Sequence, residues 1–198
     1  MRLFIALDLE EGIRQRITLF LQGIQNFAPE TRWVKPESLH ITLKFIGEKS
    51  EEQVPRIQQA LGVIQAPSVS LAFRGYGFFP TPHTARVFWL GIESDHRLAN
   101  LAAQVDSSLA TLGIPREEHA FTPHLTLARS GSGAPHKKRE DKQNPRFQRL
   151  QEKLSAMPPV DFGTMTAQEF FLYQSKLSSG GSRYTKLASF LLQNHQDS

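Results

Sequence analysis

The chain has 198 residues, of which 39% are hydrophobic and 21% are charged, with 14 Phe and a formal net charge of +4. This length suits one domain, and the composition is that of a folded globular protein rather than a disordered chain. The absence of cysteine excludes disulfides, a thiolate nucleophile and Cys-ligated zinc.

The N-terminal segment predicts a buried strand rather than a targeting signal. Its apolar run, "RLFIAL", stops at Asp8, which is too short for the core of a signal peptide. No other segment approaches the length needed to span a membrane. We therefore expect a soluble, cytoplasmic protein that does not associate with a membrane.

The first half of the chain alternates between strand-like and helix-like patterns. Apolar residues recur every second position in the predicted strands and every third or fourth position in the predicted helices. The expected elements, in chain order, are a strand over 2–9, a helix starting near 10, a loop over 28–38, a strand over 39–46, a helix over 51–64 and strands over 68–79 and 85–92.

The second half continues with similar elements. We expect a helix over 95–112, a strand starting near 121, a helix over 147–154 and strands over 165–175 and 183–192. The order strand, helix, histidine-bearing strand, helix, strand occurs twice, which favours an ancient duplication. The predicted fold class is α+β and bilobal: two antiparallel sheets flanked by helices, related by a pseudo-twofold axis, with a cleft between the lobes. Residues 1–198 then form a single domain.

A basic insert interrupts the second half at about 131–144. Between Lys137 and Lys153 the sequence has seven basic and three acidic residues, an excess that equals the net charge of the whole chain. Its Gly, Pro and charged residues are typical of a solvated loop. The alternative is an arm that steers RNA toward the protein, since local positive charge accelerates encounter with a polyanion.

Two short segments share a pattern, "HITLKF" at 40–45 and "HLTLAR" at 124–129. Side chains alternate between the two faces of a strand, so His40 and Thr42 share one face, and His124 and Thr126 do the same. The leucines and isoleucine between them point to the opposite, core-facing side. If the lobes face each other, the two His-Thr pairs meet across the cleft.

Each histidine alone could be an ordinary structural residue, and a zinc site is a further alternative. The sequence offers no third ligand at a recognisable spacing and no His-Glu-x-x-His motif. Two imidazoles, one protonated and one neutral, are suited to concerted acid and base catalysis. Hydroxyls can donate hydrogen bonds to oxygens that gain charge in the transition state. The two histidines and two threonines favour a metal-independent and cofactor-free phosphodiesterase. The alternative function is a non-catalytic module that binds RNA ends.

The segments "MRLFIALDL", "SLHITLKFIGE", "FTPHLTLAR", "RVFWLGI" and "SRYTKL" resemble the 2H phosphoesterase superfamily. The similarity is strongest to its RNA 2′,3′-cyclic phosphodiesterases, also called the bacterial and archaeal 2′-5′ RNA ligase family. The resemblance implies hydrolysis of a terminal 2′,3′-cyclic phosphate to a 2′-phosphate, with reversible 2′-5′ ligation in some members. It also implies RNA ends or small cyclic-phosphate nucleotides as substrates, and a monomer is sufficient.

The resemblance further implies His40 as the proton donor and His124 as the proton acceptor, with Thr42 and Thr126 binding the phosphate. The spacing alone leaves open which histidine is the acid. Arg129 and Phe45 occupy the sixth position of their motifs and are candidate substrate contacts, and the alternative for Phe45 is an aromatic of the core. The odd spacing from His124 to Arg129 would put this arginine on the opposite face unless the strand ends or twists.

Three further residues, Arg86, Tyr184 and Lys186, fall on strands that could line the cleft. The remaining histidines have no partner motif, and we expect all of them to be exposed to solvent: His83, His96, His119, His136 and His195.

Overall fold

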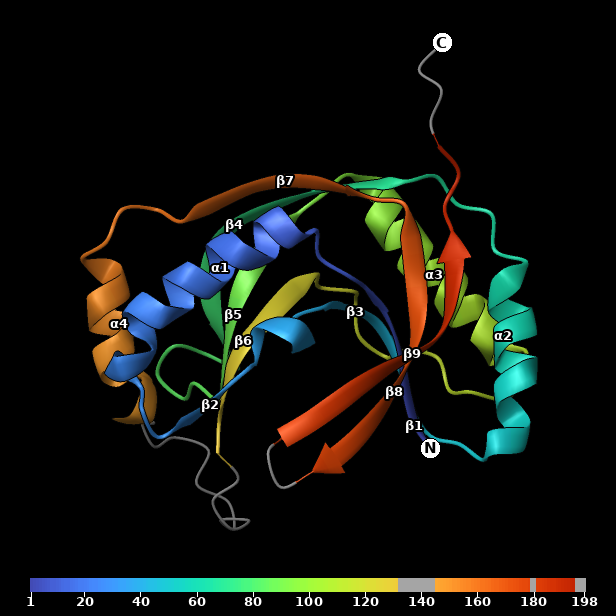
Figure 1. The fold of residues 1–198 in the computed structure, drawn as a ribbon, viewed down its shortest axis with the longest axis horizontal. Coiled ribbons are helices and arrows are strands. Elements are labelled where there is room, and N and C mark those ends of the chain that lie inside the picture. Colours follow the sequence, from blue (N-terminus) through green and yellow to red (C-terminus); the bar gives the residue numbers. More distant parts are fainter. Residues whose placement is uncertain (132–144, 179–180, 195–198) are drawn as a thin grey trace.

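The computed structural model describes residues 1–131, 145–178 and 181–194, and the expected basic loop lies almost wholly outside these ranges. Within them the chain forms one curled antiparallel sheet of nine strands and four α-helices (Figure 1). In chain order these elements are β1 (Arg2–Leu7), α1 (Glu11–Ile24), β2 (Thr31–Trp33), β3 (Ile41–Glu48), α2 (Val54–Gly62), β4 (Val69–Phe79), β5 (Val87–Glu93), α3 (His96–Ala110), β6 (His124–Ser130), α4 (Gln148–Ser155), β7 (Asp161–Ala167), β8 (Glu169–Ser178) and β9 (Gly181–Leu191).

The strand order is β7-β4-β5-β6-β3-β1-β8-β9, with β2 added to β6. The order on one side of the β6–β3 junction mirrors the order on the other, so β3 and β6 each begin a four-stranded lobe. His124 is the first residue of β6, and His40 lies immediately before β3. The two expected sheets are thus continuous, joined where Ile41 of β3 pairs with Leu125 of β6. The predicted fold class, with its antiparallel strands and duplicated lobes, is confirmed.

The lobes do not coincide with the two halves of the sequence. Strand β4 pairs with β5 and β7, whereas β8 and β9 return from the C-terminal half to lie beside β1. The strand expected over 165–175 is in fact two strands, β7 and β8, which pass from one lobe to the other around Gln168. The expected loop over 28–38 also contains a strand, because β2 pairs with the end of β6.

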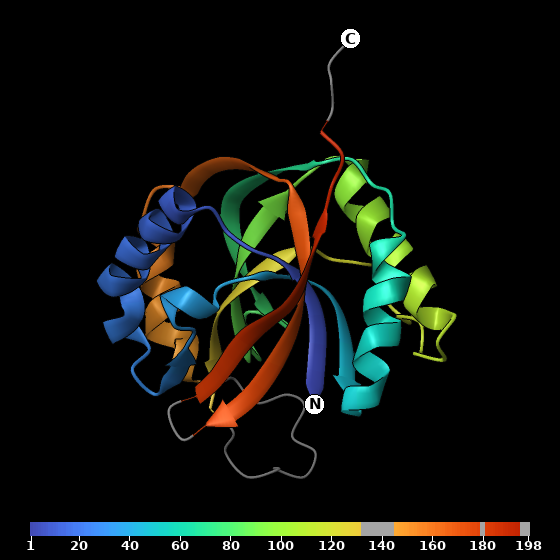
Figure 2. The same cartoon turned by 45° about the vertical axis from the view of Figure 1, so that its right-hand side comes forward.

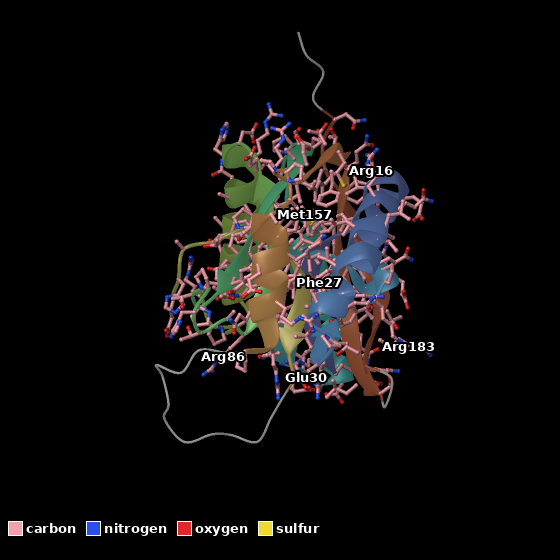
Figure 3. The ribbon with its side chains drawn as sticks, turned by 90° about the vertical axis from the view of Figure 1, so that its left-hand side faces the viewer. Arg16, Phe27, Glu30, Arg86, Met157 and Arg183 are labelled. Carbon is pink, nitrogen blue, oxygen red and sulfur yellow. The ribbon has the colours of Figure 1, made fainter. Side chains whose placement is uncertain are left out.

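The helices lie in two pairs on opposite flanks of the curled sheet, α1 with α4 and α2 with α3 (Figure 2). Each buries one apolar stripe, represented by Ile17 in α1 and Leu101 in α3, both fully buried. Phe27 and Met157 add to the core near α1 and α4 (Figure 3). Among the helices of the described residues, none has the length and apolar character needed to cross a membrane.

Candidate active site

The two His-x-Thr motifs lie side by side at the centre of the sheet. Ile41 and Leu125, the paired residues at the lobe junction, are both fully buried and fix the opposite face of each strand in the core. The alternation predicted from the sequence therefore turns both imidazoles and both hydroxyls to the other side. They line one cavity of about 530 Å³ together with the other two candidate contacts; the six residues are His40, Thr42, Phe45, His124, Thr126 and Arg129.

The two imidazoles are held in the same way. Nδ1 of His40 lies 2.7 Å from the carbonyl oxygen of Ser38, and Nδ1 of His124 lies 2.9 Å from that of Thr122. Because a carbonyl oxygen can only accept, Nδ1 must be the donor in both hydrogen bonds. In each ring Nε2 is therefore the nitrogen available to exchange a proton with a bound substrate.

Aromatic side chains from neighbouring strands pack against each imidazole. His40 lies 4.8 Å from Phe4 of β1 and 5.1 Å from Tyr184 of β9, measured between ring centroids. His124 contacts Phe79 and Trp89 at 5.2 and 6.5 Å. This packing restricts the ring rotamers, so both Nε2 atoms are preorganised relative to the cavity.

The position of Trp89 beside His124 requires a glycine at residue 77. A Cβ at Gly77 of β4 would lie only 2.1 Å from Cζ2 of Trp89, so the bare backbone leaves room for the indole. Trp89 also stacks on Phe79 at 5.0 Å, and together they form the wall against which His124 rests.

Burial is the main cause that lowers the pKa of His40 below its ordinary value of 6.5, and the positive charge of Arg129 acts in the same direction. The hydrogen bond to Ser38 and the charge of Asp8 oppose this shift but do not cancel it. The His40 imidazole is therefore mostly neutral in the free protein near pH 7. An anion in the cavity would favour its protonated form.

A β-bulge in each motif brings the sixth position back to the cavity. In β3, Thr42 pairs with Ala6 and Lys44 with Ile5, so Leu43 is the extra residue. In β6, Thr126 pairs with Trp89 and Ala128 with Phe88, so Leu127 is the extra residue. Each bulge makes two successive residues face the core. This shift in phase, rather than the end of the strand, turns Phe45 and Arg129 toward the same cavity as the histidines.

Of the three further residues that the sequence placed near the cleft, one lines the cavity and two do not. Tyr184 lines the cavity, whereas Lys186 pairs with Asp8 at 2.6 Å and Arg86 lies before β5 and does not line it (Figure 3). Three histidines expected on the surface, His83, His96 and His119, are exposed, and the remaining two, His136 and His195, lie outside the described residues.

Arg2 also lines the cavity, although the sequence patterns did not single it out. Arg2 and Phe4 are two positions apart on β1 and share a face, so strand alternation could have identified this arginine once Phe4 was placed beside His40.

An ion-pair network supports the turn that carries His40. Asp8, just after β1, pairs with both Arg14 of α1 and Lys186 of β9. Arg14 also donates a hydrogen bond to the carbonyl oxygen of Pro36, in the turn that includes Ser38. Helix α1 is thereby tied to the segment whose carbonyl orients the His40 ring. The hydrogen bonds from Lys186 and Leu9 and the charge of Arg14 outweigh burial and lower the pKa of Asp8, which therefore stays ionised at neutral pH.

The described residues contain no group of three or more His, Asp or Glu side chains placed to hold a metal ion. The arrangement instead offers two anchored imidazoles, two threonine hydroxyls and two arginines around one cavity. Cationic groups and hydroxyl donors are suited to a phosphate, and two imidazoles can move protons at its ester oxygens. The fold and the site together define a two-histidine phosphoesterase.

The comparison with protein families makes this assignment specific. A family model described as "LigT like Phosphoesterase" matches residues 7–89 and, separately, 90–184. The chain belongs to this family of LigT-like phosphoesterases. The two consecutive matches agree with the internal duplication.

Relatives and solved structures cover nearly the whole chain. It is 34% identical over 190 residues to an RNA 2′,3′-cyclic phosphodiesterase of Archaeoglobus fulgidus, covering 96% of this chain and 99% of that protein. The enzyme of the same name from Escherichia coli is 32% identical, with 96% of each chain covered. The crystal structure of E. coli LigT complexed with 3′-AMP superposes with a TM-score of 0.75 and 31% identity, over 96% of this chain and 97% of that one.

Proposed function

We propose that this protein is a metal-independent RNA 2′,3′-cyclic phosphodiesterase, which opens a terminal 2′,3′-cyclic phosphate to leave a 2′-phosphate. The observation that carries the proposal is the pair of Nδ1-anchored imidazoles on one cavity. Relatives that bear this enzyme name match the chain over almost its full length, which supports the same assignment.

In the proposed reaction His124 Nε2 accepts a proton from water as the water oxygen attacks phosphorus. The bond between phosphorus and O3′ breaks, and His40 Nε2 donates its proton to the departing O3′. The reaction consumes one water molecule, and it leaves His40 neutral and His124 protonated. Exchange with solvent restores the starting state.

Thr42 and Thr126 donate hydrogen bonds to the non-bridging phosphate oxygens in this scheme. Both belong to the same motifs as the histidines and line the same cavity. Hydroxyl donors held in place before the reaction stabilise charge that develops on the phosphate in the transition state.

A neutral His40 in the free protein is compatible with its proposed role as the donor. The substrate carries the negative charge of a phosphodiester, which favours the protonated imidazole and raises its pKa when the complex forms. The His40 proton is then taken up with the substrate.

The proposed substrates are RNA ends and small nucleotides that carry the cyclic phosphate. Phe45, 58% exposed, supplies a ring on which a base can stack. Replacement of the attacking water by the 5′-hydroxyl of a second RNA would join the ends through a 2′-5′ linkage by the same proton transfers. We also propose that the protein acts as a monomer in the cytoplasm.

A nucleoside 2′,3′-cyclic phosphate incubated with the protein in excess EDTA tests the proposal. We expect turnover to the nucleoside 2′-phosphate, which chromatography separates from the 3′-phosphate isomer. Saturable binding of the cyclic nucleotide without turnover would identify a non-catalytic RNA-end-binding module instead. Turnover abolished by EDTA and restored by a divalent metal would contradict metal independence.

A further inference from the structure

A second cavity, of about 590 Å³, adjoins the one that holds the histidines. It lies between β2 and the hairpin of β8 and β9, which face each other at one end of the molecule (Figure 1). The two cavities share lining residues, among them Arg129, Ser182 and Tyr184. Together they form a continuous groove that begins at the histidines.

Basic residues line both parts of the groove. Arg2 and Arg129 line the catalytic cavity, and Arg32 and Lys35 extend the line of cations into the second one. No Asp or Glu of the described chain is among the residues that line either cavity. Glu30, at the same end of the molecule (Figure 3), approaches Arg146 at 3.9 Å and lies outside both linings.

Two of these arginines are direct partners across the strands. Arg32 of β2 pairs with Arg129 of β6 in antiparallel register, so both side chains project from the same face of the sheet. Both guanidinium groups can therefore reach a phosphate bound on that face.

Apolar surface accompanies the charge. Trp33 pairs with the buried Ala128 and its ring meets the buried Phe88 edge-on at 6.0 Å, so its indole anchors β2 on the core side, opposite Arg32. Leu177 of β8 lines the same cavity and is 77% exposed. The Tyr184 ring, which lines both cavities, and the Leu177 side chain are the groups there against which a nucleobase can pack.

We propose that this second cavity is a binding subsite for the nucleotide immediately 5′ to the cyclic-phosphate end of an RNA strand. The inference rests on the proposed function. Arg129 stands between the two sites, and Arg32 and Lys35 bind the phosphate that joins the last two nucleotides. The subsite gives the enzyme a preference for an RNA strand over a mononucleotide.

The test compares a trinucleotide ending in a 2′,3′-cyclic phosphate with the corresponding mononucleotide. For Lys35→Glu and Arg32→Ala/Lys35→Ala we expect the ratio of kcat/KM between trinucleotide and mononucleotide to fall about five- to tenfold, because phosphate contacts dominate affinity for single strands. The salt dependence of kcat/KM for the trinucleotide should become shallower by about 0.7 in log–log slope for each phosphate that the variant no longer neutralises. Lys49→Ala/Arg56→Ala is the matched control. It also removes two positive charges, but from a separate cavity beside α2.

Binding is measured in parallel, with a trinucleotide and a mononucleotide that both end in a 2′-phosphate. A wild-type protein that turns over neither substrate would refute the proposed function, and the binding ratio would still decide the subsite. An unchanged ratio of trinucleotide to mononucleotide affinity in Lys35→Glu would overturn the inference. So would an equal loss in the Lys49→Ala/Arg56→Ala control.

Discussion

Phe45 of β3 and Arg129 of β6 occupy equivalent positions, each three residues after the threonine of its motif and just beyond a β-bulge. Both side chains line the cavity that contains the histidines. The two lobes thus present the same His-Thr pair but different third groups, an aromatic ring on one side and a guanidinium on the other. In the proposed complex this asymmetry lets Phe45 contact a base and Arg129 contact a phosphate.

Arg129→Ala should lower kcat/KM for a nucleoside 2′,3′-cyclic phosphate by about 10- to 100-fold, the range for the removal of a hydrogen bond between charged groups. Steady-state kinetics with this small substrate measure the effect. Arg183→Ala, on the exposed side of β9, is the control for the loss of one positive charge. An equal loss in both variants would show that Arg129 contributes only to the overall charge.

The pH dependence of kcat/KM should reveal the lowered pKa of His40. This parameter reports the free enzyme, in which a proton donor must still carry its proton. Because the pKa of His40 is below 6.5 in the free protein, activity should start to fall with rising pH below that value. This alkaline limb should disappear from the residual activity of His40→Ala. If the acidic limb disappears instead, His40 is the base and the proposed roles are reversed.

Arg14 should act as a positioning residue for His40. Arg14→Ala releases the turn at Pro36 and Ser38, and we expect kcat to fall about tenfold with little change in KM, since small displacements of a catalytic group are costly. Arg16→Ala on the same helix is exposed and makes a suitable control (Figure 3). Arg14→Lys should restore part of kcat. A rise in KM alone would argue against positioning.

A buried ion pair behind β3 should contribute to stability rather than catalysis. Nζ of Lys44, whose side chain is 1% exposed, lies 2.6 Å from Oδ1 of Asp106 in α3. Asp106→Asn leaves this ammonium without its main partner and should reduce the free energy of unfolding by about 2–3 kcal/mol in urea titrations. Asp161→Asn, which removes the exposed partner of Arg74, is the control and should have a much smaller effect.

The same pair predicts the acid sensitivity of the fold. Burial alone would raise the pKa of Asp106, but its hydrogen bonds with Lys44 and Glu117 lower it below the usual 3.8. The stabilisation is therefore fully present above that pH and is lost as the pH falls through the lowered pKa. Asp106→Asn should accordingly lose less stability than the wild type on acidification. Equal losses in both proteins would contradict this assignment.

The sequence was most informative where structure depends on local alternation. The two-residue period of β3 and β6 placed His40 and His124 on one face of their strands, and the anchored leucines and isoleucine followed from the same period. The orientation of the residues beyond the two β-bulges could not be predicted in this way. The extra residues Leu43 and Leu127 arise from pairing with β1 and β5, which a single strand's sequence does not reveal.

Long-range pairing was also beyond the reach of sequence patterns. The apolar pattern over 165–175 gave no indication that the chain changes lobes around Gln168, because β7 and β8 pair with strands that are far away in the sequence. Strand β2 has only three residues and precedes Pro36, so its pattern is too short to distinguish it from a loop. Both features matter for the site, since β2 and β8 line the second cavity.

The most direct test of the central claim is kcat/KM for a nucleoside 2′,3′-cyclic phosphate in His40→Ala, His124→Ala and the double variant. Each single change should lower kcat/KM by about 10²- to 10⁴-fold. Because both histidines act in one proton-transfer step, the double variant should be no more than about tenfold below the worse single variant. Retention of wild-type kcat/KM by either single variant would contradict two-histidine acid and base catalysis.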